Sequence, residues 1–160
     1  MAKVFWIESN PPRRLAIVLR PPGSGKIQET LDEYRQSGIE ILVSLLETEE
    51  AAMLGLADEA SAAEKAGIEF LHYPMADMGV PQAPDSFNEF TKNLAHRLRA
   101  GRSIGIHCRG SVGRSTLAAA CALIHLGWTP QKAIDAIGAA RGMLVPQTQE
   151  QEDWILNFQV

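Results

Sequence analysis

The sequence has little cysteine, no long apolar run and little net charge. Cys108 and Cys121 are its two cysteines, too few for a disulfide framework, and we expect both to be free thiols in a reducing compartment. No stretch approaches the ~18 consecutive apolar residues of a membrane span, so no membrane partner is expected. The net charge of −4 argues against the basic surface that a nucleic-acid partner needs.

Three short signals are absent as well. Residues 1–14 contain no apolar run followed by small residues, so no secretory leader is expected and a cytoplasmic location is predicted. The segment 23–26 (GSGK) is not a nucleotide-binding loop, because Arg20 and Ile27 stand where that motif needs a glycine and a hydroxyl residue. The histidines and cysteines have no metal-ligand spacing, and we expect no metal ion and no cofactor.

What the sequence does contain is an alternation of apolar runs and helical spacings. Strands are predicted at 4–7, 15–19, 39–45, 68–73 and 103–107, with a turn at 10–12. Helices are predicted at 27–37, 49–66, 86–100, 116–126, 130–141 and 147–158. Ser86 and Glu89 form a capping-box signature for the third of these helices.

This alternation predicts an α/β fold in which residues 1–160 form one domain. The central sheet should have about five largely parallel strands, with helices on both faces. Ligands in such sheets bind at the C-terminal ends of the strands. The loop after strand 103–107 is therefore the first place to look for a site.

That loop has the composition of an anion-binding site. The strand delivers Cys108 to its end, Arg114 follows six positions later, and Ser115 stands at the start of an apolar helix. Backbone N–H groups of such a short turn can surround one tetrahedral anion. The predicted phosphate-binding residues are Arg109, Gly110, Ser111, Val112, Gly113 and Arg114.

The side chains of the loop fit a phosphate in particular. Gly110 and Gly113 are expected to adopt the unusual backbone dihedrals that an anion nest needs. Arg114 offers a planar fork that binds two phosphate oxygens at once. These positive surroundings are expected to lower the pKa of Cys108, which makes it a thiolate nucleophile in position for in-line attack.

The pattern His107-Cys108, five residues, Arg114-Ser115 resembles the signature loop of the cysteine-dependent protein-tyrosine and dual-specificity phosphatases. The likeness is greatest to the compact dual-specificity type, including the cyclin-dependent kinase inhibitor 3-like branch. It implies a mixed, mostly parallel sheet and a two-step, metal-free mechanism through a phosphocysteine. It also implies that Ser115 assists the departure of the thiolate. For His107 the resemblance implies contacts that help to fix the loop and to hold the thiolate charged. The alternative is a buried strand histidine whose ring is satisfied by backbone groups.

A second motif, Pro74 to Pro81, is similar to the general-acid loop of small dual-specificity phosphatases. Asp77 lies 31 positions before Cys108, a separation typical of that group. A carboxylic acid is needed because the leaving oxygen must be protonated. The loop departs from the larger tyrosine phosphatases, which carry Trp-Pro before the aspartate. Asp85 is the rival acid, although its position suits the start of a helix better.

Several functions remain open on the sequence alone. The first is hydrolysis of phosphotyrosine, and further of phosphoserine or phosphothreonine, in a phosphorylated protein or peptide. The alternatives are a phosphatase of a phosphoinositide, nucleotide or RNA 5′-phosphate, or a non-catalytic phosphopeptide-binding module. Lipid phosphatases of this superfamily usually carry lysines in the loop, and here the interior holds one arginine. Gln147 and Gln149 lie where the family places a segment beside the pocket, and a glutamine there could orient the hydrolytic water. Surface positions at a helix start are the favoured explanation for both residues.

Overall fold

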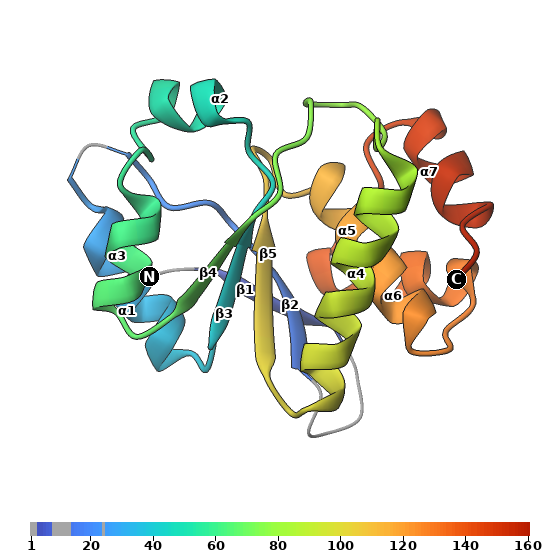
Figure 1. Ribbon diagram of the computed structural model, residues 1–160, viewed down its shortest axis with the longest axis horizontal. Helices are drawn as coiled ribbons and strands as arrows, with labels where there is room; N and C mark the ends of the chain where they lie inside the picture. The colour runs from blue at the N-terminus through green and yellow to red at the C-terminus, as the bar shows by residue number, and fades with distance from the viewer. Residues whose placement is uncertain (1–2, 8–13, 24) are drawn as a thin grey trace.

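The computed structural model describes residues 3–7, 14–23 and 25–160, and in these ranges the chain forms a five-stranded sheet (Figure 1). The strand order is β1-β2-β5-β3-β4. The strands are β1 (Val4–Ile7), β2 (Arg14–Val18), β3 (Ile41–Ser44), β4 (Glu69–His72) and β5 (Ser103–His107). β1 is antiparallel to β2, and the other pairs are parallel. The predicted mixed, mostly parallel sheet is confirmed, while the predicted turn at 10–12 lies outside the described residues.

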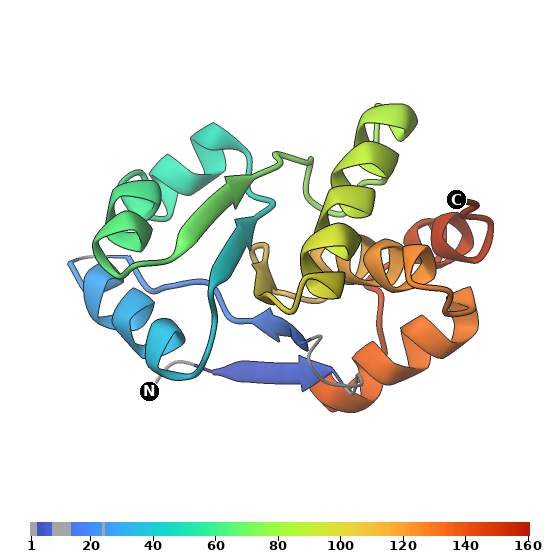
Figure 2. The same cartoon turned by 60° about the horizontal axis from the view of Figure 1, so that its bottom comes forward.

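Helices cover both faces of this sheet (Figure 2). They are α1 (Ile27–Gln36), α2 (Thr48–Met53), α3 (Glu59–Lys65), α4 (Pro84–Arg99), α5 (Arg114–His125), α6 (Pro130–Arg141) and α7 (Gln149–Leu156). One apolar core lies between the sheet and α1 with α3, and the larger core lies between the sheet and α4 to α7. No helix in the described ranges has the length and apolar character needed to cross a bilayer.

Alternating strand residues explain why both faces are covered. In β2, Leu15 and Ile17 enter the larger core, whereas Ala16 and Val18 enter the smaller one. A strand that is apolar at every position is stable only between two layers of helix. On β5, Gly105 faces the smaller core at a crowded point, where an added Cβ would lie 3.1 Å from side-chain atoms of both Ile39 and Val18.

Two sequence predictions about helices are wrong. The segment 49–66 is not one helix, because the chain turns at Gly55, whose φ of 73° is left-handed, and so separates α2 from α3. The predicted capping box at Ser86 does not form. Helix α4 instead begins at Pro84, whose missing N–H suits a first helical position, and the Ser86 hydroxyl accepts a hydrogen bond from Tyr73 at 3.0 Å.

Candidate active site

The loop that carries Cys108 is held between two buried elements. β5 is buried along its whole length and ends at His107, and α5 is buried from Arg114 to Ile124. Cys108 itself is only 2% exposed. The positive end of the α5 dipole and its free N–H groups therefore face the loop.

The backbone of the loop differs from the sequence prediction in one respect. The left-handed φ, 55°, falls on Ser111, whereas Gly110 and Gly113 do not have positive φ. The Ser111 hydroxyl donates to the carbonyl of Val18 at 2.7 Å, which helps to hold this unfavourable backbone conformation. Gly113 is required for space instead, because an added Cβ would lie 2.8 Å from Oε1 of Gln151.

Arg141, at the end of α6, supports the loop from behind. Its Nε donates to the carbonyl of Ser111 at 2.9 Å, and its Nη2 lies 3.4 Å from the carbonyl of Gly110. Since the C=O and N–H of a trans peptide point in opposite directions, the N–H groups that follow these carbonyls point away from Arg141. Burial lowers the pKa of Arg141, and the charge of Cys108 opposes this effect. The sequence analysis missed Arg141, and no local motif marks it.

The side chain of Arg114 is completely buried and is held in a fixed plane. Glu50 accepts hydrogen bonds from both terminal nitrogens, at 2.8 and 2.9 Å, and the carbonyl of Met75 accepts another from Nη1 at 2.9 Å. The Nε atom is buried and has no hydrogen-bond partner among the residues that the structure describes. Burial alone would lower the pKa of Arg114, but the hydrogen bonds that it donates to Glu50 and the charges of Cys108, Glu50 and Asp77 outweigh this effect and raise the pKa.

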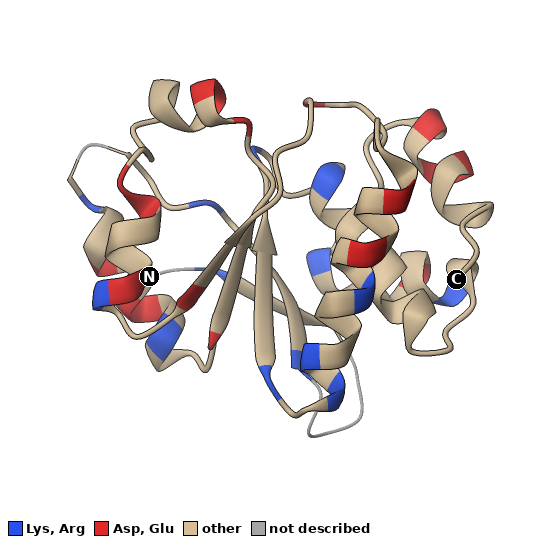
Figure 3. Cartoon of the chain, viewed as in Figure 1, with Lys and Arg blue, Asp and Glu red and all other residues tan. Residues whose placement is uncertain are grey.

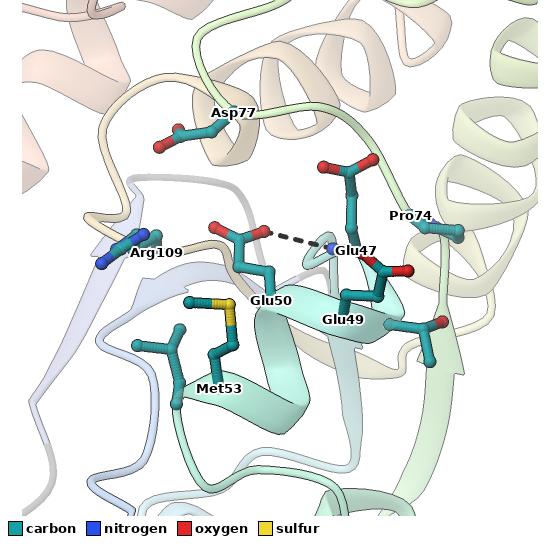
Figure 4. A pocket seen from close by; sticks show the side chains of 9 residues that line it. Glu47, Glu49, Glu50, Met53, Pro74, Asp77 and Arg109 are labelled. Atoms are coloured by element: carbon teal, nitrogen blue, oxygen red, sulfur yellow. Dashed lines mark hydrogen bonds between the residues drawn. The ribbon is translucent and has the colours of Figure 1, made fainter.

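Glu50 comes from α2, and sequence reasoning missed it. It is the N3 residue of a capping box whose N-cap residue is Glu47, and this box is the signal that could have indicated an ordered helix start here. In the view of Figure 4 the Glu50 carboxylate lies to the right of Arg109 and below Asp77, and a dashed line marks its hydrogen bond with the Glu47 backbone nitrogen. The hydrogen bond from Arg114 holds the pKa of Glu50 below its usual value.

The structure brings Asp77, and not Asp85, to the loop. An Asp77 carboxylate oxygen lies 3.1 Å from Nη2 of Arg114, and the side chain is 45% exposed. Its other contact is with the N–H of Met78, at 2.9 Å. Asp85 lies in the first turn of α4 and lines a different hollow, together with Glu150 and Trp154.

Three more residues from the sequence analysis, Ser115, His107 and Cys121, are all buried. Ser115 is buried and its hydroxyl oxygen has no partner in the structure. His107 contacts the carbonyl of Cys108 and the carboxylate of Glu59. Cys121 is buried in the middle of α5, and this burial raises the pKa of its thiol well above the usual value.

The glutamines around the start of α7 lie in different environments. Gln147 approaches the loop, since its Oε1 lies 3.0 Å from the position of an added Cβ on Gly113. Gln149 is exposed and donates to Asp153. Gln151, which the sequence analysis missed, is fully buried and donates to the carbonyl of Gly79 in the acid loop at 3.1 Å. It therefore connects the acid loop to the phosphate loop.

A cavity of about 700 Å³ opens beside Asp77 and Arg109 (Figure 4). Its lining residues are Glu47, Thr48, Glu49, Glu50, Met53, Leu54, Pro74, Asp77 and Arg109. Four of the nine are acidic and one is basic. No cluster of three or more His, Cys, Asp and Glu side chains suited to a metal ion occurs in the described part of the chain.

A cysteine at a strand end, a buried arginine at the next helix start and a nearby aspartate define the class of cysteine-dependent phosphatases. The profile of one family, described as "Polymorphic toxin system, DSP-PTPase phosphatase", matches residues 18–128. The chain therefore belongs to the dual-specificity phosphatase family, as the signature loop predicted.

Curated relatives and solved structures agree with this assignment. Cyclin-dependent kinase inhibitor 3 of Rattus norvegicus is 32% identical over 134 residues, which are 82% of this chain and 63% of the relative. The chain thus spans less than two thirds of that protein. Kinase associated phosphatase with its catalytic cysteine replaced by serine has the same fold, with a TM-score of 0.83, 24% identity and coverage of 99% and 98%. Tk-PTP in its active form has a TM-score of 0.75, 27% identity and coverage of 96% and 92%.

Proposed function

We propose that the chain is a phosphoprotein phosphatase that hydrolyses phosphotyrosine, and further phosphoserine and phosphothreonine, through a phosphocysteine. The observation that carries the proposal is the environment of Arg114. Its guanidinium is buried, fixed by Glu50 and influenced by the charge of Cys108, and its Nε is left without a partner. A buried N–H without a hydrogen-bond partner at a helix start is suited to donate a hydrogen bond to a bound anion.

In the first step, the loop N–H groups and Arg114 bind the substrate phosphate. The sulfur of Cys108 attacks phosphorus, so that an S–P bond forms and the ester P–O bond breaks. The electron pair of that bond goes to the leaving oxygen, which takes a proton from Asp77. In the structure Asp77 contacts Nη2 of Arg114, so the incoming phosphate replaces the carboxylate there and leaves it at the site entrance.

In the second step, water attacks the phosphorus of phosphocysteine while Asp77, now a carboxylate, accepts its proton. The S–P bond breaks, inorganic phosphate leaves and Cys108 returns to a thiolate. The buried hydroxyl of Ser115 is free to donate a hydrogen bond to that sulfur. Gln147, beside Gly113, is the glutamine placed to orient the water.

The charge around the cavity supports a peptide substrate over a lipid or nucleotide. Acidic positions mark α2, which lines the cavity, whereas Lys and Arg positions gather around the end of α4 and the start of β5 (Figure 3). A phosphoinositide or nucleotide would bring further phosphates to the acidic cavity, and like charges repel. A phosphopeptide with a basic residue beside its phosphorylated residue would complement it.

A substrate panel at one ionic strength tests the proposal. The panel compares phosphotyrosine and phosphothreonine peptides, each with arginine or glutamate flanks, with a nucleoside monophosphate and a phosphoinositide. Highest kcat/KM on arginine-flanked peptides supports the proposal. Highest kcat/KM on the lipid or nucleotide would favour the alternative enzyme, and tight peptide binding without turnover would favour a binding module. Cys108→Ser is the control for contaminating phosphatases.

A further inference from the structure

A buried glutamate lies directly behind the nucleophile, and the proposed reaction gives it no task. Glu59 is the first residue of α3, and His107 is the last residue of β5. Their side chains are 3% and 0% exposed, and Oε2 of Glu59 lies 2.5 Å from Nε2 of His107. The other ring nitrogen, Nδ1, lies 3.2 Å from the carbonyl oxygen of Cys108.

The hydrogen-bonding capacity of these groups limits where the protons are. A carbonyl oxygen only accepts, so Nδ1 of His107 must carry a proton if it is to bond Cys108. One further proton is then shared between Nε2 and Glu59. The pair is either an imidazolium with a carboxylate or an imidazole with a carboxylic acid. Both forms are neutral overall, but only the first places positive charge next to Cys108.

The position of Glu59 is costly for a carboxyl group. Helix α3, which carries Glu59, packs on the smaller core, and Tyr34 of that core is close enough to be affected by the charge of Glu59. The Tyr34 hydroxyl donates to the carbonyl of Leu19 and is therefore not directed at Glu59. Burial, and after it the charge of Glu59, raises the pKa of Tyr34. Among the described residues, the ion-pair partner of Glu59 is His107. An apolar side chain would fill this place at lower cost.

We propose that Glu59 is a positioning residue that keeps His107 doubly protonated, so that the positive end of the buried pair supports the Cys108 thiolate. The inference rests on the proposed role of Cys108 as nucleophile. Two further cations, Arg114 and Arg141, are affected by the charge of Cys108, and Arg114 is itself paired with Glu50 and Asp77. Glu59 differs from these because it reaches Cys108 through the imidazole and the peptide carbonyl.

Glu59→Gln tests the idea, because glutamine can still bond Nε2 of His107 but cannot balance an imidazolium. The measurement is the rate of iodoacetamide alkylation at Cys108 against pH, followed by mass spectrometry so that buried Cys121 is scored separately. The pH of half-maximal rate should rise by roughly one unit, which is about tenfold slower alkylation on the acidic side. Glu64→Gln, on the exposed face of α3, is the matched control and should leave the curve unchanged.

A double variant shows whether Glu59 acts through His107. Once His107→Asn has removed the imidazole, adding Glu59→Gln should shift the alkylation curve no further. A further shift in the double variant, or an unchanged curve in Glu59→Gln, would overturn the proposal. Alkylation needs no turnover, so a failure of the proposed phosphatase activity is separately visible as missing hydrolysis by the unmodified chain.

A measurement on the unmodified chain covers the case in which Glu59→Gln does not fold. Nitrogen chemical shifts of the His107 ring distinguish a doubly protonated ring from one with a proton on Nδ1 alone. Two protonated nitrogens at neutral pH are expected. A single protonated nitrogen would assign the shared proton to Glu59 and end the proposal.

Discussion

The Glu50 carboxylate binds both terminal nitrogens of Arg114, at 2.8 and 2.9 Å, and so fixes the plane in which the guanidinium can meet a phosphate. A bidentate pair of this kind sets orientation as well as charge. In the proposed mechanism Glu50 acts on the substrate through Arg114, and its removal should be visible both in stability and in kinetics.

Glu50→Gln should lower kcat/KM for a small aryl phosphate by about tenfold to a hundredfold, because Arg114 loses its fixed orientation. It should also cost about 2 kcal/mol of unfolding free energy at pH 7, since a buried guanidinium is left with a weaker partner. Steady-state kinetics and urea unfolding measure the two effects. Glu89→Gln, exposed on α4, is the control. Unchanged kinetics in Glu50→Gln would show that other contacts alone hold Arg114.

The stability difference should depend on pH in one direction. The pKa of Glu50 is lowered in the folded chain from its usual 4.5, with the Arg114 hydrogen bond as the largest cause. The contribution of the pair is thus fully present above pH 4.5 and is lost as the pH falls through the lower folded value. The gap between the unmodified chain and Glu50→Gln should stay constant from pH 7 to about 5 and shrink below that. A gap that widens in acid would contradict the assignment.

Gly113→Ala should impair the phosphate loop more than Gly110→Ala. An added Cβ at Gly113 would lie 2.8 and 2.9 Å from Oε1 and Nε2 of Gln151, whose amide is already committed to Gly79 and to the start of α7. At Gly110 no atom lies within 4 Å of the added Cβ. We expect Gly113→Ala to lower the melting temperature by several degrees, about 1–3 kcal/mol, while Gly110→Ala stays near the unmodified value. Equal melting temperatures would mean that Gln151 moves aside freely.

The fold and the local parts of the site could be predicted because their signals are local. Cys108, Arg114 and Ser115 lie within one strand–loop–helix unit, and the apolar residues Ile104 and Ile106 mark the strand that precedes them. The capping box at Ser86 was wrong because Pro84, two positions earlier, begins the helix, and because the serine hydroxyl accepts a hydrogen bond from the distant Tyr73. Tertiary contacts of this kind override local capping preferences.

The supporting residues could not be predicted, since each reaches the loop from a distant element. Glu50 is 64 positions from Arg114, Glu59 is 48 from His107, and Arg141 is 30 from Ser111. Their pairing depends on the sheet order, which places β3 beside β5 and brings the start of α2 to the Cys108 loop. No spacing rule in a single sequence encodes such contacts. The catalytic roles of Cys108, Asp77 and Ser115 stay predictions.

Cys108→Ser should abolish turnover and still bind phosphate analogues. An alcohol is too weakly acidic to replace the thiolate, whereas the loop N–H groups and Arg114 remain. Calorimetry with tungstate and a phosphatase assay measure the two properties. The unmodified chain should be inhibited by vanadate and should keep its activity in EDTA. Steady hydrolysis by Cys108→Ser, or activity that EDTA removes and a divalent ion restores, would remove Cys108 from the role of nucleophile.

Asp77 and Asp85 are the two candidates for the general acid, and replacing each of them separately distinguishes between them. Asp77 lies 3.1 Å from Nη2 of Arg114, whereas Asp85 lines another hollow at the start of α4. A positioned general acid typically contributes ~10²–10⁴-fold in rate, so Asp77→Asn should slow hydrolysis of an alkyl or phenyl phosphate by that range. The loss should shrink for p-nitrophenyl phosphate, because a good leaving group needs little protonation.

The control for this prediction is Asp85→Asn, which should leave kcat for both substrates nearly unchanged. Its expected effect is a helix start weakened by ~0.3–1 kcal/mol, since a negative charge in the first turn of α4 is lost. Leaving-group dependence is the decisive readout, because a general loss of packing slows good and poor substrates alike. If Asp85→Asn shows the leaving-group-dependent loss and Asp77→Asn does not, the acid lies eight positions later, at the start of α4, and the contact between Asp77 and Arg114 serves to close the empty phosphate site.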